Sequence, residues 1–343
     1  MSRMSPGKQR RMRRLSSSDG IIAALAIDQR GTLWRALAEA GKLSEDVLPE
    51  RMAEFKACVT RILGPHATAV LLDVDYGMRA IAARDPRVGL LLAYEKWGYD
   101  TGAPGRLQQT LEGWDVPRLM EAGADCIKLL LYYTPFESEP INARKQEWIR
   151  RIGQECLAND IPFCLEPVTY DPAGTGENTL AFARTKPWAV EGCAREFSKP
   201  EYGVDLLKIE IPVNLAFVAG TRANGGRPAV CSRSEALEAY RRTASATRLP
   251  FVYLSAGVSN EVFLESLERA AEAGVPYNGV LCGRATWKDA IPVYAQHGVT
   301  ALEDWLSDVG VRNIQALNNL VARSASPWWD RLDDADAAGA ATA

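Results

Sequence analysis

Histidine and long apolar runs are scarce in this sequence, and their scarcity excludes two classes of protein. Only two histidines, His66 and His297, occur among 343 residues, and both adjoin expected loops rather than strand ends. A zinc centre built from imidazole ligands therefore lacks its donors. No apolar run is long enough to span a bilayer, and the basic start over residues 1–14 has no apolar segment behind it. We therefore expect neither a signal peptide nor a membrane contact.

Paired cysteines, an excess of positive charge and two common catalytic motifs are also missing. The seven cysteines show no C-x-x-C spacing and lie mostly in apolar runs, which is typical of reduced thiols in a cytoplasmic protein. A net charge of -3 argues against binding to nucleic acid. The sequence has no G-x-S-x-G elbow of a serine hydrolase and no glycine-rich nucleotide loop after the first expected strand.

A phrase that occurs twice places one lysine inside each of two apolar segments. Residues 123–129 read Gly-Ala-Asp-Cys-Ile-Lys-Leu, and residues 203–209 read Gly-Val-Asp-Leu-Leu-Lys-Ile, so Lys128 and Lys208 hold equivalent positions. Burial of an unpaired ammonium group is costly, and it favours the neutral amine that can form a Schiff base with a ketone. The alternative is that both lysines lie at strand ends and keep their charged groups in water.

Eight short apolar runs alternate with stretches that have helical spacing. Apolar strands separated by helices indicate a parallel sheet covered on both faces. Eight such units predict a (β/α)8 TIM barrel in a single domain, with a doubly wound open sheet as the alternative. The expected strands are 21–27, 69–74, 89–94, 126–131, 162–165, 206–211, 250–254 and 279–282. The expected helices include 47–63, 116–122, 143–156, 234–246, 262–273 and 301–322.

The two ends of the chain are expected to lie outside the barrel. The first segment is strongly basic and the last is rich in aspartate and alanine. Such compositions cannot bury enough apolar surface to order a chain. We expect a disordered basic extension over residues 1–16, the barrel over 17–328 and a frayed tail over 329–343.

A TIM barrel carries its site at the carboxyl ends of its strands. Asp28 and Gln29 follow the first strand, Glu166 ends the fifth, and Lys128 and Lys208 lie in the fourth and sixth. Alternate strands contribute inward side chains to one layer, so the two lysines are expected to be neighbours, and their repulsion favours a neutral amine. Glu166 would move protons beside the imine. The alternative is a buried ion pair between Glu166 and Lys128 that only stabilises the barrel.

Strands seven and eight end in residues that suit a phosphate group. Gly257 and Gly283 let the backbone approach a ligand closely, and Arg284 can grip phosphate oxygens with its planar fork. Alone, Arg284 would more often be a surface cation. Two further carboxylates, Asp73 and Asp75, follow strand two and could hold magnesium, because this cation prefers oxygen ligands.

Six segments together resemble the tagatose 1,6-bisphosphate aldolase family. They include Asp28-Gln29-Arg30-Gly31 and span residues 25–31, 90–96, 128–133, 207–214, 253–259 and 280–287. The resemblance covers about residues 17–328. It implies a class I lyase on a (β/α)8 barrel that uses no metal and no cofactor. The expected reaction is cleavage of tagatose 1,6-bisphosphate to glycerone phosphate and glyceraldehyde 3-phosphate, as in lactose and galactose catabolism.

The resemblance also implies a role for each site residue. Lys208 would form the Schiff base, Glu166 would be the main proton shuttle, and Lys128 and Asp28 would assist. The residues implied in substrate binding are Gln29 beside the reacting hydroxyls and, at the ketose-side phosphate, Ser255, Gly257, Gly283 and Arg284. The stretch 171–200 departs from the family pattern, which bears on the choice of sugar.

Other functions remain open at this point. A related branch cleaves 6-deoxy-6-sulfofructose 1-phosphate, and fructose 1,6-bisphosphate is a second alternative substrate. A phosphosugar-sensing protein on the same scaffold is an alternative of a different class. The expected partner is a phosphorylated ketose, and the expected assembly is a cytoplasmic homo-oligomer, since closed symmetric assemblies are common.

Overall fold

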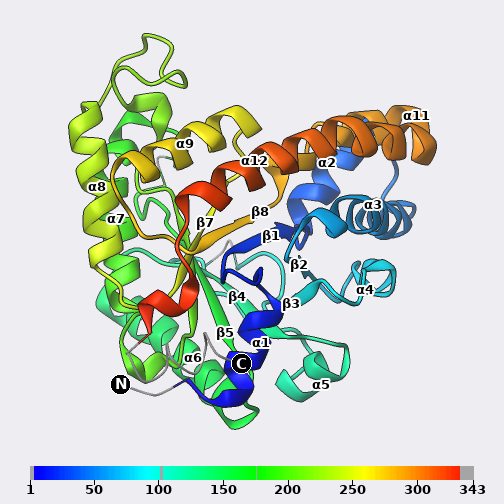
Figure 1. The fold of residues 1–343 in the computed structure, drawn as a ribbon, viewed down its shortest axis with the longest axis horizontal. Helices are drawn as coiled ribbons and strands as arrows, with labels where there is room; N and C mark the ends of the chain where they lie inside the picture. Colours follow the sequence, from blue (N-terminus) through cyan, green and yellow to red (C-terminus); the bar gives the residue numbers. More distant parts are fainter. Residues whose placement is uncertain (1–3, 101–102, 175, 333–343) are drawn as a thin grey trace.

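Eight parallel strands close into a barrel in the computed structural model, which describes residues 4–100, 103–174 and 176–332 (Figure 1). The strands pair in chain order, and β1 returns to pair with β8. Their bounds are β1 (Ile22–Ala26), β2 (Ala69–Leu72), β3 (Gly89–Ala93), β4 (Cys126–Tyr132), β5 (Phe163–Val168), β6 (Leu206–Glu210), β7 (Phe251–Leu254) and β8 (Gly279–Cys282). The predicted (β/α)8 barrel is confirmed, and the open sheet is wrong.

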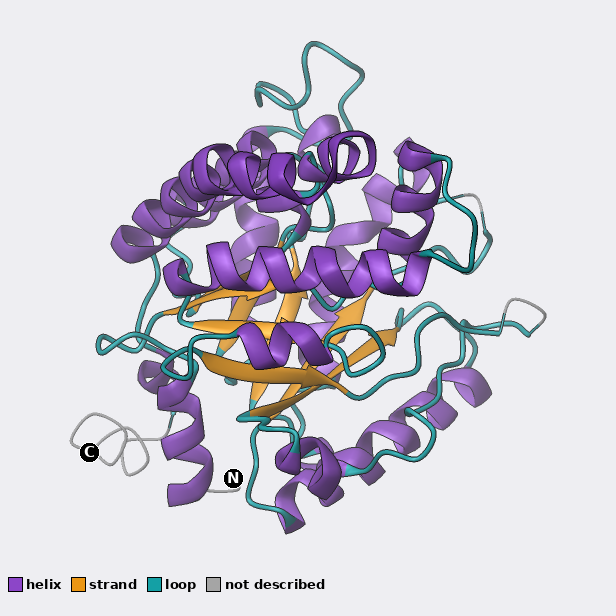
Figure 2. Cartoon of the chain, turned by 90° about the vertical axis from the view of Figure 1, so that its right-hand side faces the viewer, coloured by secondary structure: helices purple, strands orange, loops and turns teal. Residues whose placement is uncertain are grey.

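Helices surround the strands on the outside of the barrel (Figure 2). They are α2 (Gly31–Gly41), α3 (Leu48–Leu63), α4 (Met78–Ala83), α5 (Val116–Glu121), α6 (Glu139–Ala158), α7 (Leu180–Glu196), α8 (Arg233–Ser245), α9 (Asn260–Glu272), α10 (Arg284–Trp287), α11 (Ala290–Trp305) and α12 (Val311–Ser324). Shorter turns are η1 (Gly64–His66), η2 (Pro200–Tyr202), η3 (Leu215–Phe217), η4 (Leu306–Gly310) and η5 (Trp328–Arg331). Within the described ranges, no helix combines the length and apolarity needed to cross a membrane.

Strand β5 extends further than the sequence predicted. The expected strand ended at residue 165, shortly before Pro167, which lacks the N–H that a strand ladder uses. Strand β6 pairs with β5 only up to Leu165, so Pro167 lies beyond that part of the ladder and is tolerated. Glu166 is therefore held inside a regular strand rather than in a loop.

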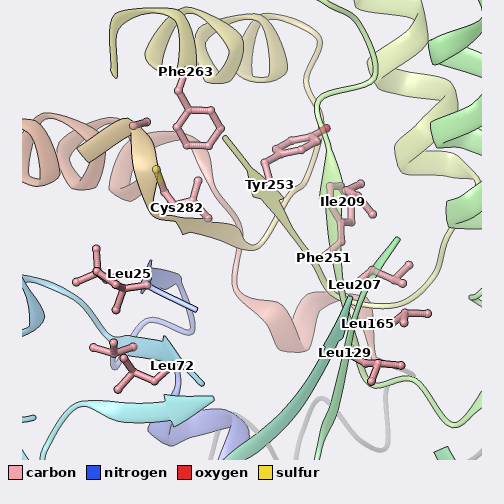
Figure 3. Close-up of a cluster of buried hydrophobic side chains, with 14 of the residues drawn as sticks. Leu25, Leu72, Leu129, Leu165, Leu207, Ile209, Phe251, Tyr253, Phe263 and Cys282 are labelled. Atoms are coloured by element: carbon pink, nitrogen blue, oxygen red, sulfur yellow. The ribbon is translucent and has the colours of Figure 1, made fainter. Parts of the chain in front are cut away.

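Side chains of each strand alternate between two separate apolar layers. One layer lies between the sheet and the helices, and Figure 3 shows part of it, including Leu129, Leu165 and Leu207. The other fills the barrel interior and contains the residues next to these, such as Cys164 and Leu206. This period of two is what strand geometry dictates.

The basic N-terminal segment is a helix that packs against the barrel, α1 (Pro6–Arg14). Met12 and, just after the helix, Leu15 are fully buried in the interior layer. The prediction of a disordered extension over residues 1–16 is therefore wrong for the helix and for the residues that follow it. The charge of this segment suggested a solvated chain, but Met12, Leu15 and the paired Lys8 give it a buried side.

The aspartates of the repeated phrase anchor α1. Lys8 Nζ lies 2.7 Å from Asp205 Oδ2, and Arg14 Nε lies 2.7 Å from Asp125 Oδ1. Both aspartates directly precede strands, so α1 covers the amino end of the barrel, opposite to the end expected to carry the site (Figure 1).

Part of the expected C-terminal tail is also ordered. Trp328 is fully buried in the interior layer, and its backbone N–H donates to the carbonyl of Gly20 at 3.0 Å. Residues 329–331 continue the turn η5, so the prediction of fraying from residue 329 onward is wrong there. Residues 333–343 lie outside the described part of the chain.

Candidate active site

The period of two places three predicted residues on the inner face of the barrel. Lys128 lies between Ile127 and Leu129, which both belong to the outer layer. Lys208 likewise lies between Leu207 and Ile209, and Glu166 follows Leu165 of the same layer. These inner side chains stand beyond the apolar interior layer, toward the carboxyl ends of the strands. The sequence therefore places charged groups where the barrel opens, and apolar groups beneath them.

A cavity of about 700 Å³ opens at this end of the barrel. It is lined by six of the predicted site residues: Asp28, Gln29, Glu166, Lys208, Ser255 and Arg284. Lys128 is fully buried behind the wall. The structure thus brings the predicted residues into one place, with Lys208 lining the cavity and Lys128 beneath its surface.

Glu166 joins the two lysines. Its Oε2 atom lies 2.8 Å from Lys128 Nζ and 2.8 Å from Lys208 Nζ. In the described part of the chain this oxygen has no partner with hydrogen-bond alignment, so it remains available as a proton acceptor. The side chain of Lys208 is 4% exposed, and Glu166 is the carboxylate that contacts it.

Lys128 has three carboxylate neighbours. Its Nζ atom lies 2.8 Å from Asp28 Oδ2, 3.1 Å from Glu95 Oε1 and 2.8 Å from Glu166 Oε2. Burial alone favours the neutral amine, but Asp28, Glu166 and Glu95 outweigh it and raise the pKa of Lys128 well above its ordinary value. The prediction that repulsion between the lysines dominates this site is therefore wrong for Lys128, because carboxylates lie between and around them. Lys128 is a cation.

Asp28 is a carboxylate held in its charged form. Burial raises its pKa, but Lys128, Lys208 and Arg30 together lower it to below the ordinary value. Its Oδ1 atom and the Oε1 atom of Gln29 are buried and have no hydrogen-bond partner in the described residues. Two adjacent acceptors without donors at a cavity wall suit the hydroxyl groups of a sugar.

The ends of β7 and β8 approach each other around Arg284. A Cβ atom on Gly257 would lie 2.8 Å from Arg284 Cζ, so the guanidinium rests against this glycine, whose φ is +79°. A Cβ atom on Gly283 would lie 2.2 Å from the carbonyl oxygen of Ala26, so only glycine fits between β8 and β1. Ser255 is buried beside them at the cavity wall. This cluster offers one cation and closely approachable backbone to an anion.

Two charged residues of the site, Glu95 and Arg30, had no role predicted from the sequence. Glu95 lies two residues after the end of β3, and Arg30 lies two residues after Asp28, beyond the end of β1. Arg30 Nη2 lies 2.9 Å from Glu95 Oε1, and Arg30 Nη1 lies 3.2 Å from Asp75 Oδ2. Their position at strand ends was a signal that sequence reasoning could have used.

The opposite wall of the cavity carries Arg106 and Lys186, which no pattern in the sequence identified. Arg106 Nη2 lies 2.7 Å from Glu177 Oε1, and its guanidinium lies 5.5 Å from the ring centre of Tyr132 at the end of β4. Lys186 Nζ lies 3.1 Å from Glu210 Oε1. Arg106 comes from the segment between β3 and α5 and Lys186 from helix α7, so their place at the cavity depends on tertiary packing.

The two aspartates considered for magnesium are paired with cations instead. Asp73 and Lys56 are both fully buried and form an ion pair, and Asp73 Oδ1 also accepts the backbone N–H of Tyr76 at 2.8 Å. Asp75 faces Arg30. The described residues contain no group of three or more histidine, cysteine or acidic side chains that could hold a metal ion. The carboxylates of both aspartates are therefore paired with cations of the protein.

A family model described as DeoC/LacD family aldolase matches residues 22–289 of this chain. Tagatose 1,6-diphosphate aldolase 2 of Enterococcus faecalis (strain ATCC 700802 / V583) is 46% identical over 328 residues, covering 96% of this chain and 97% of that protein. Tagatose 1,6-diphosphate aldolase of Listeria monocytogenes serotype 4b (strain CLIP80459) is 44% identical over 331 residues, covering 96% of each chain. The sequence likeness thus extends over nearly the whole length.

Solved structures share the barrel at much lower identity. A fructose-bisphosphate aldolase from Plasmodium falciparum, in complex with TRAP and a small-molecule inhibitor, matches with a TM-score of 0.69 at 14% identity, over 95% of this chain and 98% of that one. An archaeal fructose 1,6-bisphosphate aldolase matches with a TM-score of 0.55 at 17% identity, over 91% of this chain and 98% of that one. These similarities support the fold.

Proposed function

Because the chain belongs to the DeoC/LacD family of aldolases, we propose that it is a class I lyase that cleaves tagatose 1,6-bisphosphate to glycerone phosphate and glyceraldehyde 3-phosphate. The observation that carries the proposal is the contact of Lys208 with Glu166 at 2.8 Å on the wall of the cavity. It supplies an amine and a proton acceptor side by side, which Schiff-base chemistry requires.

The reaction begins when Lys208 passes its proton to Glu166 and its neutral amine adds to the C2 ketone. The resulting carbinolamine loses water, with a proton returned by Glu166, and leaves a protonated imine. The C4 hydroxyl then gives its proton to Glu166, which is a carboxylate again, the C3–C4 electron pair moves into the imine, and glyceraldehyde 3-phosphate departs. Glu166 returns this proton to C3 of the enamine, and addition of water to the imine releases glycerone phosphate and restores the ammonium group of Lys208. The imine is the electron sink, so the reaction needs no metal and no cofactor.

Lys128 and Asp28 support this sequence without forming covalent bonds. Lys128 lies 2.8 Å from Glu166 Oε2 as a cation and holds this carboxylate beside Lys208. Asp28 offers its unpartnered Oδ1 atom, and Gln29 its Oε1 atom, to the hydroxyls next to the bond that breaks. Holding these hydroxyls fixes the sugar with C2 toward Lys208.

The cluster of Ser255, Gly257, Gly283 and Arg284 is proposed to bind the phosphate on C1. Replacing Arg284 by alanine is expected to lower kcat/KM about 10- to 100-fold, the effect of losing one hydrogen bond to a charged group. The loss should be similar for every ketose 1-phosphate, whatever group C6 carries, because this phosphate positions C2. Steady-state kinetics on substrates with and without a C6 phosphate measure it.

Arg61 provides the control for this variant, since its side chain is 52% exposed and pairs with Glu303 away from the cavity. An Arg61→Ala protein should keep the kinetics of the parent. If Arg284→Ala loses activity only toward substrates phosphorylated at C6, the orientation of the sugar is the reverse of the one proposed.

Arg106 is proposed to meet the group on C6. It lies over the end of β4, and in a closed barrel of eight strands β4 stands opposite β8, where Arg284 lies. Arg106→Leu is expected to lower kcat/KM for tagatose 1,6-bisphosphate about 10- to 100-fold, while tagatose 1-phosphate should be cleaved as by the parent. Equal losses for both substrates would place Arg106 elsewhere on the reaction path.

Two alternatives to this substrate remain within the same chemistry. Fructose 1,6-bisphosphate differs from tagatose 1,6-bisphosphate at one hydroxyl, and 6-deoxy-6-sulfofructose 1-phosphate carries a sulfonate where the others carry the C6 phosphate. A comparison of kcat/KM for the three compounds tests the proposal, which fails if tagatose 1,6-bisphosphate is not among the substrates that are cleaved. A phosphosugar sensor would bind these compounds without turnover, and the complete set of Lys208, Glu166 and Lys128 favours catalysis over such a role.

We also propose that the enzyme is a cytoplasmic homo-oligomer that acts in lactose or galactose catabolism. Six of its seven cysteines are buried and all seven are unpaired, which suits a reducing compartment. Size-exclusion chromatography with light scattering measures the assembly.

A further inference from the structure

Glu95 is a buried carboxylate whose contacts are all to fixed donors. It is 3% exposed. Its Oε1 atom lies 2.9 Å from Arg30 Nη2 and 3.1 Å from Lys128 Nζ, and its Oε2 atom accepts the backbone N–H of Leu130 at 2.9 Å. Arg30 Nη1 also donates to the carbonyl oxygen of Glu95 at 2.7 Å. These contacts join the end of β3 to the end of β4 and hold the carboxylate in one orientation.

The three carboxylates around Lys128 differ in what the reaction asks of them. Under the proposed function, Glu166 gains and loses a proton, and Asp28 turns one oxygen toward the substrate. Glu95 neither transfers a proton nor contacts the substrate, because both of its oxygens are already bonded. During each interval in which Glu166 is protonated, Asp28 and Glu95 are the charged neighbours left to Lys128.

We propose that Glu95 is a positioning residue that keeps Lys128 a cation through the whole reaction cycle and thereby reserves Schiff-base formation for Lys208. The inference rests on the proposed function. The repeated phrase gives the two lysines equivalent strand positions, so strand position alone does not separate their roles. Their surroundings do, since among the residues that the structure describes three carboxylates contact Lys128 and one contacts Lys208.

The pH at which Lys128 loses its proton depends on the ionisable groups around it. Burial raises the pKa of the Cys164 thiol to about 12 and also raises the pKa of the Tyr132 phenol, so neither ionises at moderately alkaline pH. The charged groups that face Lys128 are Asp28 and Arg30 after β1, Glu95 after β3, Glu166 on β5 and Lys208 on β6. Removing Glu95 takes away one anion and lowers the pKa of Lys128. Lys128 then loses its proton as the pH rises through this lower value.

Glu95→Gln tests the proposal, because the amide keeps the shape and removes the charge. The alkaline limb of the kcat profile is expected to move toward neutral pH by about 1–3 units, the range that one nearby charge produces. Borohydride reduction of the enzyme with substrate at alkaline pH should then place part of the label on Lys128, whereas the parent should carry it on Lys208 alone. Glu95→Asp restores the charge, so it should restore most of the alkaline limb even where Glu95→Gln folds poorly.

Asp75→Asn is the matched control, since Asp75 is the other carboxylate that contacts Arg30 and it does not contact Lys128. It should leave the pH profile unchanged. The proposal is overturned if Glu95→Gln lowers kcat equally at every pH, or if Asp75→Asn moves the limb as far. A parent protein without turnover would instead overturn the proposed function, and this inference with it.

Discussion

Replacing Lys208 with methionine is expected to lower kcat on the order of 10⁶-fold, the scale on which an enzyme loses activity with its covalent nucleophile. Methionine has a similar length and no amine, so the cavity keeps its shape while the imine cannot form. Lys128 cannot replace the missing nucleophile, because the three carboxylates that contact it hold it as a cation. Single-turnover and steady-state assays with tagatose 1,6-bisphosphate measure the loss.

Borohydride trapping identifies the nucleophile independently of the rate. Reduction of the parent with glycerone phosphate should attach the three-carbon unit to Lys208, and mass spectrometry of a digest locates it. The Lys208→Met protein should remain unlabelled under the same conditions. Lys186→Met is a useful control, since Lys186 is another lysine of the cavity wall and pairs with Glu210 rather than Glu166. Label on Lys128 in the parent, or on no lysine, would reject the assignment.

Much of this site follows from strand periodicity. Lys128 and Lys208 lie two residues after Cys126 and Leu206, and both of these belong to the interior layer. A strand repeats its direction every two residues, so the lysines had to point inward as well. The closing of eight strands into a barrel then brings β4, β5 and β6 side by side. The sequence pattern was sufficient for these steps.

The distances between side chains were not predictable in the same way. The sequence suggested that two like charges would meet, but the register of β5 places Glu166 between them. Glu95 reaches Lys128 because β3 and β4 pair in a register that sets Ala93 beside Lys128, and no local pattern encodes this register. Arg106 enters the cavity from a connecting segment, so its place depends on contacts with residues distant in the chain.

The repeated phrase also anchors helix α1, through the aspartate of each copy. Asp125 and Asp205 stand three positions before Lys128 and Lys208, at the other end of the same strands. They hold Arg14 and Lys8 of α1, and each also accepts a backbone N–H from a neighbouring strand. Each copy of the phrase therefore links the closed amino end of the barrel to its reactive end. The composition of residues 1–16 suggested disorder because local composition does not reveal tertiary partners. The aspartates that pair with Lys8 and Arg14 lie more than a hundred residues away in the sequence.

Replacing Glu166 with glutamine is expected to lower kcat about 10²- to 10⁴-fold, the usual contribution of a positioned acid or base. The amide keeps the shape of the side chain but can neither take the proton of Lys208 nor return it to the departing water. Lys128 keeps Asp28 and Glu95 as partners, and Lys208 lines the cavity. The variant should therefore fold and bind substrate with a KM close to that of the parent.

Glu210→Gln separates this role from a purely structural ion pair. Glu210 and Glu166 are equally buried at 6% exposure, and Glu210 also contacts a lysine, Lys186. Its Oε2 atom accepts the N–H and the hydroxyl of Thr169, and its Oε1 atom faces Lys186, so both of its oxygens are engaged within the protein. If burial of an ion pair were all that mattered, both variants would lose thermal stability and activity together. If Glu166 is a proton shuttle, Glu166→Gln should lose turnover while its circular dichroism spectrum stays unchanged. Glu210→Gln should keep kcat within about tenfold of the parent, a smaller loss than removal of a catalytic acid or base causes.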